Sequence, residues 1–434
     1  MTIDELIRVW NAYPRRDSLI TDRLAGEYIP AELKANRIDG RPKSKVIAAW
    51  EEAILSFWVG FLGGKDIKYE ALGEADQASV DHWRLQYKQL NLHKIDSLTL
   101  ETALTFGEAV EVVSLVNGKV KVTSYDPTHW AFIEEEGEPV IAILKVVVPK
   151  GTILRGELTK REHTFFWIYS DERVQEVEIT ESGPRVRSDN EHPFGRLPVI
   201  RYRVDKTGQG LFTTNLLNMI DDFNICRSSL SDSIKYGIDP LLLLTGLSLR
   251  QLFSSEVVAS IPNQDGSETE VRKSLSSVIK ETGVLCLPDK EASANFISKS
   301  VSIEQLKYAL LCSWASIHQA ASIPDLTIAP GSTAPVISSV SGVALKMKFQ
   351  TSLHRGEKIG RYFEPGLERR FDLLQRVNEI MRKPRFNAEA SLDPRLPVNE
   401  AEWAMLIAPL MNLLPRQEVA NLVPMIENQI IVEE

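Results

Sequence analysis

Two helical patterns separated by a loop occupy residues 302–382. After Ser302, a residue suited to capping a helix, apolar side chains recur every three or four positions, the spacing of one helix face. They are Ile303, Leu306, Leu310, Trp314 and Ile317. Pro324 should end this helix, because a proline disfavours helical backbone in the residue before it. A longer helical pattern runs over 341–382, and Pro365 with Gly366 should kink or break it.

The loop between these helices, residues 324–340, is long and almost uncharged. Pro330, Gly331 and Pro335 prevent regular structure, and the one charged residue is Asp325. A loop of this length is usually functional or disordered. Its candidate functional side chains are Asp325, Thr327, Ser332, Thr333, Ser338 and Ser339.

The first hundred residues have mainly helical patterns. Thr2 and Glu5 have the spacing of a capping box, which predicts a helix at the amino terminus. Further helices are predicted over 75–90 and over 94–106, the second ending at Gly107. The apolar segment 46–62 is too short to span a bilayer. Its aromatic side chains should face a core or a neighbouring subunit: Trp50, Phe57, Trp58 and Phe61.

From Glu108 the pattern changes to that of β-strands. Asn117-Gly118 between two apolar runs predicts a hairpin. Further strands are predicted over 140–148, 164–169 and 176–179, joined by polar turns, so this region should be antiparallel. A helix should follow over 211–236, with an apolar face made by Leu216, Leu217, Ile220, Phe223, Leu230 and Ile234.

Residues 238–300 read as a small α/β insertion between two long helices. We expect a buried strand at 241–244, a short helix over 250–260, and a strand pair formed by 283–287 and 295–298. Beyond the long helix, 383–397 should be an extended connector, followed by a helix over 400–414 and a short final one. The fold class expected is therefore α+β.

Composition adds few constraints to this picture. A chain of 434 residues with 43% hydrophobic composition can bury a sizeable core, in two or more structural regions. The net charge of −9 argues against a protein that wraps non-specifically around nucleic acid. Cys226, Cys286 and Cys312 match no metal-binding spacing, so we expect reduced core residues. Neither an export signal nor a membrane span is predicted.

Charge is distributed unevenly along the chain. Residues 341–385 contain eleven Lys and Arg against five Asp and Glu, a balance of +6 within a chain of −9, so the remainder carries −15. This surplus fits a solvated helix whose Glu and Arg residues form ion pairs. It also fits a weak electrostatic contact of Lys346 and Lys348 with passing phosphate groups. Both interpretations stay open.

Catalytic motifs are missing from the sequence. It contains no phosphate-binding G-x-x-x-x-G-K-[ST] loop, no H-E-x-x-H, no C-x-x-C and no G-x-S-x-G. We therefore expect no catalytic residue, no cofactor and no metal. His318 and His354 lie on helical patterns and should have structural roles. Asp221 and Asp222 are adjacent on a helix and point in different directions, so a metal site would need further partners.

Four local stretches resemble portal proteins of tailed double-stranded DNA phages, in the branch common among long-tailed phages. Residues 91–127, a helix ending at Gly107 and then a hairpin, are similar to the entry into that family's wing. The segment H-P-F-G-R-L-P-V at 192–199 is similar to the family's N-P-F-G-x-[IL]-P-V, with His192 in place of asparagine. S-G-V-A-L-K at 341–346 and the helical region from Leu396 onward are similar to later family stretches.

The resemblance implies a non-enzymatic ring, usually of twelve copies, at one capsid vertex of the virion, assembled in the host cytoplasm. The implied partners are further copies of the chain, double-stranded DNA, the terminase large subunit, a head-to-tail connector, and the major capsid and scaffolding proteins, without a membrane. The implied regions are wing 1–210, stem helices 211–237 and 301–323, clip 238–300, tunnel loop 324–340, kinked wing helix 341–383 and a small helical crown 384–434.

Two other classes of function stay open at this point. One is a metal- or nucleotide-dependent nucleic-acid enzyme that uses Asp221 and Asp222. The other is a monomeric scaffold or binding module. Rings in particle images would separate the portal interpretation from both.

Overall fold

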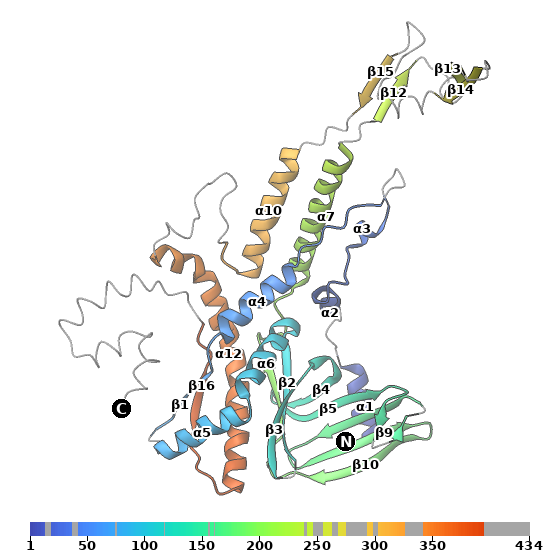
Figure 1. Cartoon of the computed structure of the whole chain (residues 1–434). Helices are drawn as coiled ribbons and strands as arrows, with labels where there is room; N and C mark the ends of the chain where they lie inside the picture. The colour runs from blue at the N-terminus through green and yellow to red at the C-terminus, as the bar shows by residue number, and fades with distance from the viewer. Residues whose placement is uncertain are drawn as a thin grey trace, which may run out of the picture. The chain divides into compact units, whose positions relative to one another are not determined.

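The structure is a computed structural model, and it describes residues 1–13, 19–36, 42–73, 76–116, 118–154, 157–159, 161–237, 241–245, 255–262, 268–274, 293–297, 303–325 and 342–394. The chain is mixed helix and sheet (Figure 1). It divides into two compact units, which agrees with the prediction of more than one structural region. Unit 1 comprises Met1–Tyr28, Ala48–Asp221 and Ser313–Glu434, and unit 2 comprises Ile29–Ile47 and Asp222–Cys312.

The helices predicted for the first hundred residues are present. In unit 1 they are α1 (Ile3–Ala12), α2 (Leu19–Leu24), α4 (Trp50–Gly63), α5 (Gln77–Gln89) and α6 (Leu92–Phe106), and in unit 2 α3 (Ala31–Lys34). The capping box of α1 is confirmed: the Glu5 amide donates to Thr2 Oγ1 at 3.3 Å, and the Thr2 amide donates to Glu5 Oε2 at 2.7 Å. Gly107 ends α6 with a φ of 86°, as expected for a glycine C-cap.

Two antiparallel sheets follow in unit 1. The predicted hairpin is β2 (Glu108–Val116) with β3 (Lys119–Tyr125), and β11 (Val199–Arg203) adds a third strand in the order β11-β2-β3. The second sheet has the order β10-β9-β8-β5-β4. Its strands are β4 (Trp130–Glu135), β5 (Glu138–Val148), β8 (His163–Tyr169), β9 (Arg173–Thr180) and β10 (Gly183–Glu191). A short turn η1 (Pro127–His129) precedes β4, and β6 (Ile153–Leu154) pairs with β7 (Glu157–Leu158). Strands β5, β8 and β9 were predicted, whereas β4, β10 and β11 were not.

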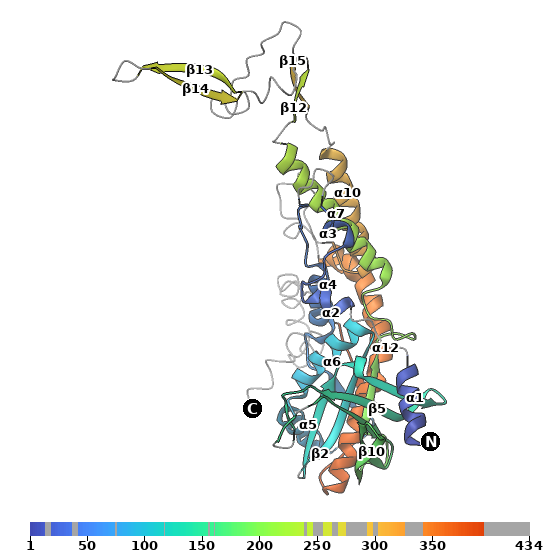
Figure 2. The ribbon, with the colours of Figure 1, turned by 90° about the vertical axis from the view of Figure 1, so that its right-hand side faces the viewer.

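The five-stranded sheet is covered on both faces. Helix α1 lies along one face (Figure 2). Its Leu6 and Trp10 pack there, and the Trp10 ring meets that of Phe166 edge to face at 5.5 Å. The other face packs against the three-stranded sheet through a second core that includes Trp130, Phe132, Val110 and Val112. The five-stranded sheet therefore lies between α1 and the three-stranded sheet.

Successive side chains of β2 point alternately to the two sides of the three-stranded sheet. Val110 and Val112 face the core between the sheets, whereas Glu111 is fully buried on the opposite side. There Arg370 Nη1 lies 3.3 Å from Glu111 Oε1, and the Tyr202 hydroxyl donates to Glu111 Oε2 at 2.8 Å. Arg370 belongs to helix α12 (Gly342–Ile380), so α12 closes this side of the three-stranded sheet.

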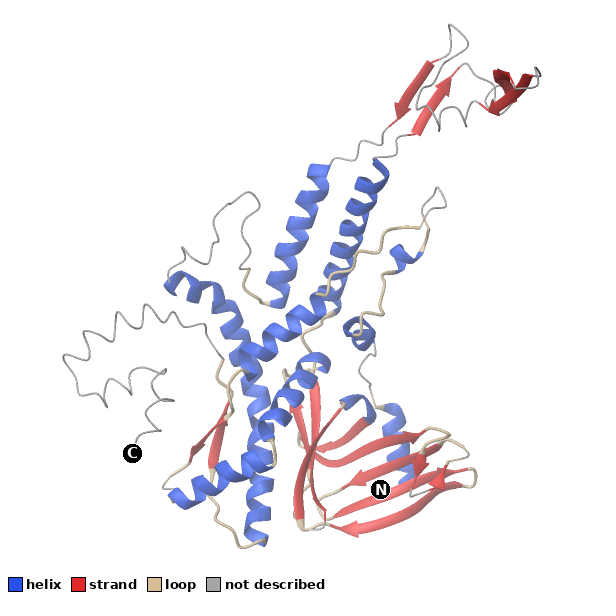
Figure 3. Ribbon diagram, in the orientation of Figure 1, coloured by secondary structure: helices blue, strands red, loops and turns tan. Residues whose placement is uncertain are grey.

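Helix α12 confirms the long helix predicted after the loop. The helix continues through Pro365 without interruption. Of the two predicted alternatives, a break at this position is therefore wrong, and a kink stays a prediction. Gly366 allows a close approach, because a Cβ atom at this residue would lie 2.5 Å from Cδ1 of Tyr202. A two-stranded sheet of β1 (Lys68–Ala71) and β16 (Ala388–Ser391) lies on the side of α12 away from the five-stranded sheet (Figure 3).

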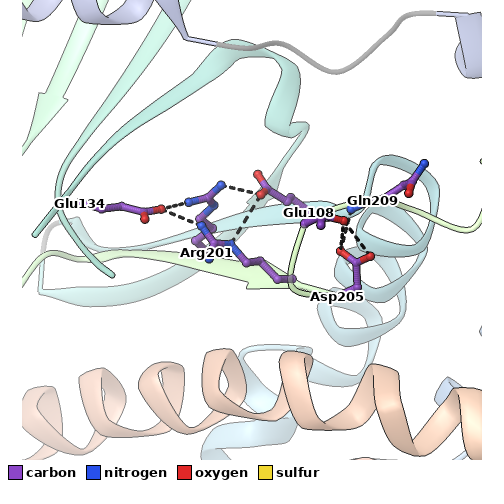
Figure 4. Close-up of polar contacts among 7 residues, drawn as sticks. Glu108, Glu134, Arg201, Asp205 and Gln209 are labelled. Atoms are coloured by element: carbon purple, nitrogen blue, oxygen red, sulfur yellow. Dashed lines mark hydrogen bonds and ion pairs between the residues drawn. The ribbon is translucent and has the colours of Figure 1, made fainter. Parts of the chain in front are cut away.

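An ionic network joins the two sheets near their ends (Figure 4). The Arg201 guanidinium lies between the carboxylates of Glu108 and Glu134, with ion pairs to both. Arg203 Nη2 lies 2.7 Å from Glu134 Oε1, so this carboxylate bridges two arginines. Beyond β11, Asp205 accepts a hydrogen bond from the Gln209 amide at 2.8 Å and shapes the turn that leads toward α7.

A backbone crossing fixes that turn against the end of α6. A Cβ atom at Gly107 would lie 1.9 Å from the Gly208 carbonyl oxygen, and one at Gly210 would lie 2.5 Å from that of Thr105. Only glycine fits at these contacts. The Leu211 amide donates to the Leu104 carbonyl at 2.8 Å, and the start of α7 is thereby positioned within unit 1.

Helices α7 (Thr214–Gly237) and α10 (Ile303–Ala321) confirm the two helices predicted on either side of the insertion, and each spans both units. The apolar face predicted for α7 is wrong at its carboxyl end, where Ile234 is 51% exposed. Ser228 and Asp232 are buried instead. They accept hydrogen bonds from the Val46 and Ser44 amides, so an extended segment of unit 2 covers a polar face.

The described parts of the insertion are strands. β12 (Leu241–Thr245) confirms the predicted first strand and pairs with β15 (Ser293–Ile297). The helix predicted over 250–260 is wrong from residue 255 onward, because β13 (Ser255–Pro262) is a strand that pairs with β14 (Glu268–Ser274). Its β-branched residues favour a strand once a partner is available. The predicted strand at 283–287 and the helices after residue 395 lie outside the described residues.

The cysteine prediction needs one correction. Cys312 is exposed and Cys226 is only half-buried, while Cys286 lies outside the described residues. Cys312 follows Leu310 by two positions, which places it about 200° around the helix from the predicted apolar face. Exposure is the expected result of that position.

Candidate functional site: the root of the loop 324–340

The last turn of α10 precedes the candidate loop. The helix ends at Ala321, and Ser322 adopts a left-handed conformation with a φ of 56°. The Ile323 amide donates to the His318 carbonyl at 3.0 Å, which closes the final turn before Pro324. The chain therefore leaves α10 in a defined direction at residues 324 and 325.

Three side chains from other helices bind the carbonyl groups at this end of α10. Arg355 Nη1 donates to the Ala320 carbonyl at 3.2 Å, and Trp58 Nε1 donates to the Ala321 carbonyl at 3.1 Å. Ser352 Oγ donates to the Ser322 carbonyl at 2.6 Å. The last carbonyls of a helix lack partners within the helix, so these donors complete its carboxyl end.

Arg355 is a cation without an ion pair in the described part of the chain. It is partly buried, and burial lowers the pKa of its guanidinium. Its surroundings are the negative end of α10, the Ser322 hydroxyl at 3.4 Å and the Trp58 ring, whose centroid lies 5.5 Å away. The helix dipole and the aromatic face both favour a positive charge at this place.

Aromatic packing brings α4 against α10 and α12 at the same root. The rings of Trp50 and Trp314 lie 4.6 Å apart, and those of Phe57 and Phe349 lie 6.3 Å apart. Trp50, Trp58 and Phe61 are buried within one chain, which agrees with the first of the two alternatives predicted for the segment 46–62, a core or a neighbouring subunit. Phe57 is half-buried.

The structure describes only part of the predicted site. Thr327, Ser332, Thr333, Ser338 and Ser339 lie outside the described residues. Asp325 is described, and its carbonyl accepts a hydrogen bond from Lys348 Nζ at 3.4 Å. Lys348 is exposed, and Lys346 is a residue of α12 whose side chain is not described. Pro365 and Gly366 line a groove of about 730 Å³ on another part of α12.

Asp221, one residue of the acidic pair considered for a metal site, is bound by neighbouring side chains. Arg23 Nη1 and Nη2 bind the two carboxylate oxygens of Asp221 at 2.9 and 2.7 Å, and Arg23 also binds Glu51 at 3.0 Å. The Tyr28 hydroxyl donates to Asp221 at 3.1 Å. This cluster joins α2, α4 and α7. Among the described residues, no group of three or more His, Cys, Asp or Glu could hold a metal ion.

The predicted structural role of His318 is supported by a hydrogen bond of 2.9 Å between its Nδ1 and the Trp314 carbonyl. His354 is exposed on α12. No helix within the described ranges is long and apolar enough to cross a membrane.

Sequence reasoning did not identify Ser352 and Arg355 as residues that bind the end of α10. With Ile359 they recur at intervals of three and four, which indicates a shared helix face. That pattern does not reveal that the face lies against the end of α10. For Trp58 the sequence predicted only that the side chain faces a core or a neighbouring subunit. It did not predict that the indole N–H donates to the Ala321 carbonyl.

Comparison with known proteins places the whole loop region within one family. The family described as "Phage portal protein, SPP1 Gp6-like" matches residues 18–433. One matching solved structure, the neck of a native GTA particle computed with C12 symmetry, has 12% identity and a TM-score of 0.44, covering 86% of this chain and 89% of that chain.

A second structure, the neck of an empty GTA particle computed with C6 symmetry, has 11% identity and a TM-score of 0.46, with the same coverage of 86% and 89%. No curated protein sequence matches the chain. The family match covers most of the chain, including α10, α12 and the loop between them, and the chain therefore belongs to the phage portal protein family.

Proposed function

We propose that this chain assembles with copies of itself into a closed ring, of twelve subunits, at one vertex of a phage capsid. Double-stranded DNA passes through the central channel during packaging and ejection. The observation that carries this proposal is the family match over residues 18–433. Head-to-tail contacts between identical subunits close a ring when the rotation between neighbours closes.

In this proposal the regions keep the boundaries inferred from the sequence. Residues 1–210 and 341–383 form the wing, 211–237 and 301–323 the stem, 238–300 the clip, and 384–434 the crown. The clip binds the terminase large subunit and later the head-to-tail connector, and the outer surface contacts the capsid and scaffolding proteins. The ring acts as a conduit and docking platform of the virion.

The loop 324–340 faces the DNA in this arrangement. Its side chains include hydroxyl groups but no cation, so it contacts phosphate groups without holding them strongly, and DNA can slide past it. Lys348 lies at the root of the loop, within hydrogen-bond distance of the Asp325 carbonyl. It supplies, with Lys346, a weak attraction for phosphate near the loop.

Three arginines introduced into the loop test this role. The variant Ser332→Arg, Thr333→Arg, Ser338→Arg should form rings in negative-stain images but package much less nuclease-protected DNA, because each added cation binds phosphate. The matched control changes the same residues to Asn. Normal packaging by the arginine variant would remove the loop from the channel, and a chain that is monomeric under all assembly conditions would overturn the ring.

A further inference from the structure

A groove of about 730 Å³ in unit 1 lies between α12, β11 and the turn that joins β4 to β5. Its volume is comparable with that of pockets that bury a drug-sized molecule, so it can take several side chains of a partner. Tyr362 is 37% exposed at this groove. The apolar part of the lining is formed by Pro139, Val140, Leu197, Tyr362 and Pro365.

The basic residues of the described lining are all of one kind. No lysine is among them, although Lys358 lies on the preceding turn of α12. Arginine and tyrosine are enriched in protein–protein interfaces and lysine is depleted, because the lysine ammonium is more strongly hydrated. The lining is therefore typical of a surface that another protein covers. The five basic residues are Arg196, Arg201, Arg203, Arg361 and Arg369.

Carboxylates of the groove pair with four of these arginines. Arg369 Nη1, for example, lies 2.9 Å from Glu138 Oε2. Glu134 bridges two arginines in the network that Figure 4 shows. These ion pairs hold the arginine side chains in place and neutralise most of their charge. The pairs are Arg201–Glu134, Arg203–Glu134, Arg369–Glu138 and Arg196–Asp372.

Arg361 of α12 is the exception, because it is exposed and has no ion pair within the described part of the chain. Of the two remaining carboxylates, Glu368 accepts a hydrogen bond from the Ala390 amide, and Asp171 is exposed. The lining contains five arginines and five carboxylates. This balance does not suit a phosphate backbone, which is bound by an excess of cations. A protein segment that brings a carboxylate to Arg361 fits the groove better.

The charge distribution of the chain indicates a second copy as that protein. Residues 341–385, which include Arg361, carry +6, whereas the remainder of the chain carries −15. A neighbouring copy therefore offers an excess of carboxylates outside this region. A contact between the groove of one copy and an acidic surface of the next joins two different faces, which is the kind of contact that can close a ring.

We propose that the groove receives a carboxylate-bearing segment of a neighbouring copy of the chain, and that Arg361 binds this carboxylate. Tyr362 and Pro365 pack against the same segment. That the contact repeats around a closed ring rests on the proposed function, whereas the contact between two copies does not.

A zero-length cross-link identifies the occupant of the groove. Arg361→Lys places an amine at this position, and a carbodiimide joins such an amine to a carboxylate in direct contact as an amide. The assembled full-length protein is made from equal parts of unlabelled and isotope-labelled chain. Mass spectrometry should find mixed-isotope peptides in which position 361 is joined to an Asp or Glu from outside 341–385. Cross-links of position 361 in peptides of one isotope only, or none at all, would overturn the proposal.

Charge reversal measures how much Arg361 contributes to assembly. Arg361→Glu should raise the protein concentration for half-maximal assembly about tenfold, because it sets a carboxylate against the partner's carboxylate. The matched control is Lys358→Glu, an equal charge change at an exposed residue of α12 outside the groove lining. It should change this concentration by less than about twofold.

The urea midpoint of Arg361→Glu should match that of the parent, because an exposed side chain without an ion pair contributes little to folding. Unchanged assembly of Arg361→Glu would contradict the proposal. Equal effects of the two variants would also contradict it, because net charge alone would then govern assembly. The cross-link decides the question independently if Arg361→Glu lowers the midpoint.

The groove contact and the closed ring can fail separately. Rings that form normally in Arg361→Glu would leave the portal ring standing and remove the groove from its subunit contacts. Mixed-isotope cross-links at position 361 in an open oligomer, without rings in negative-stain images, would support the groove contact and overturn the closed ring.

Discussion

Individual residues carry roles in this chain that their immediate neighbours in the sequence do not suggest. Gly366 follows Pro365, and the pair indicates a disturbed helix. In the structure the helix continues, and the missing side chain of Gly366 makes room for the buried ring of Tyr202. The glycine thus serves packing between α12 and β11, whatever the local bend at the proline.

A comparison of two helical glycines tests this role. In Gly366→Ala the new methyl group would lie 2.5 Å from the Tyr202 ring, so we expect a loss of about 1–3 kcal/mol in the free energy of unfolding. Gly60→Ala in α4 meets no atom within 4 Å and should stabilise by about 0.5–1 kcal/mol. Urea denaturation measures both. A neutral Gly366→Ala would mean that the ring moves aside freely.

At the scale of elements, buried polar networks join helices to sheets. Arg370 of α12 is fully buried and bonds to Glu111 of β2 and, through Nη2 at 2.9 Å, to the Tyr69 hydroxyl of β1. Asp96 of α6 and Tyr202 of β11 also belong to this cluster. Removing one member of such a network leaves the others buried without partners, so these elements should respond together to its disruption.

The network predicts a loss of stability in alkaline solution. Burial raises the pKa of Tyr69 from 10.0 to about 12. The unfolded chain loses this proton first, so the free energy of unfolding should be retained below pH 10 and should fall between pH 10 and 12, by about 2 kcal/mol from this group.

The corresponding variant is Tyr69→Phe. It should be less stable at neutral pH, because Arg370 loses an acceptor, but its stability should decline less steeply between pH 10 and 12. Denaturation curves at each pH give both quantities. Parallel pH profiles for the two proteins would show that Tyr69 does not ionise in the unfolding reaction.

At the scale of the whole molecule, the hydrophobic cores described in unit 1 are built from unit 1 alone. The core between the sheets and the core beneath α1 contain only residues from Met1–Tyr28 and Ala48–Asp221. The strands β12 to β15 belong to unit 2. The insertion should therefore be replaceable without loss of the two sheets of unit 1.

Replacing residues 241–297 by a Gly-Ser linker tests this independence. The thermal transition of unit 1 should shift by less than about 4 °C, since no residue of its two sheet cores is removed. Binding of the terminase large subunit should be lost if these residues form the clip. Calorimetry and a binding assay give the two answers. A large fall in the transition temperature would show that unit 1 depends on the insertion.

Elements with a strong local signal were predictable from the sequence. The capping box at Thr2 and Glu5, the hairpin at Asn117-Gly118 and the glycine that ends α6 at Gly107 each depend on a few adjacent residues. The resemblance in several short stretches led to the family that the comparison confirms. The residues that specify the capping box, the hairpin turn and the helix end all lie within one turn or one helix.

Other elements had no local signal, for two opposite reasons. Strand β10 is almost entirely exposed at the edge of its sheet, so no apolar period marks it. Strand β4 is covered on both faces, by α1 and by the three-stranded sheet, so its apolar residues run together instead of alternating. Each strand forms by pairing with the strand next to it in sequence, β10 with β9 and β4 with β5.

For the loop 324–340 and its surroundings, some features were also set by the sequence and others only by tertiary contacts. The sequence by itself determined its lack of cations and predicted its boundaries, because proline, glycine and charge are properties of the residues alone. Only the tertiary structure decided that Arg355, Ser352 and Trp58 hold the end of α10. Those contacts join residues that are distant in the chain, and their partners are backbone carbonyls, which no side-chain pattern identifies.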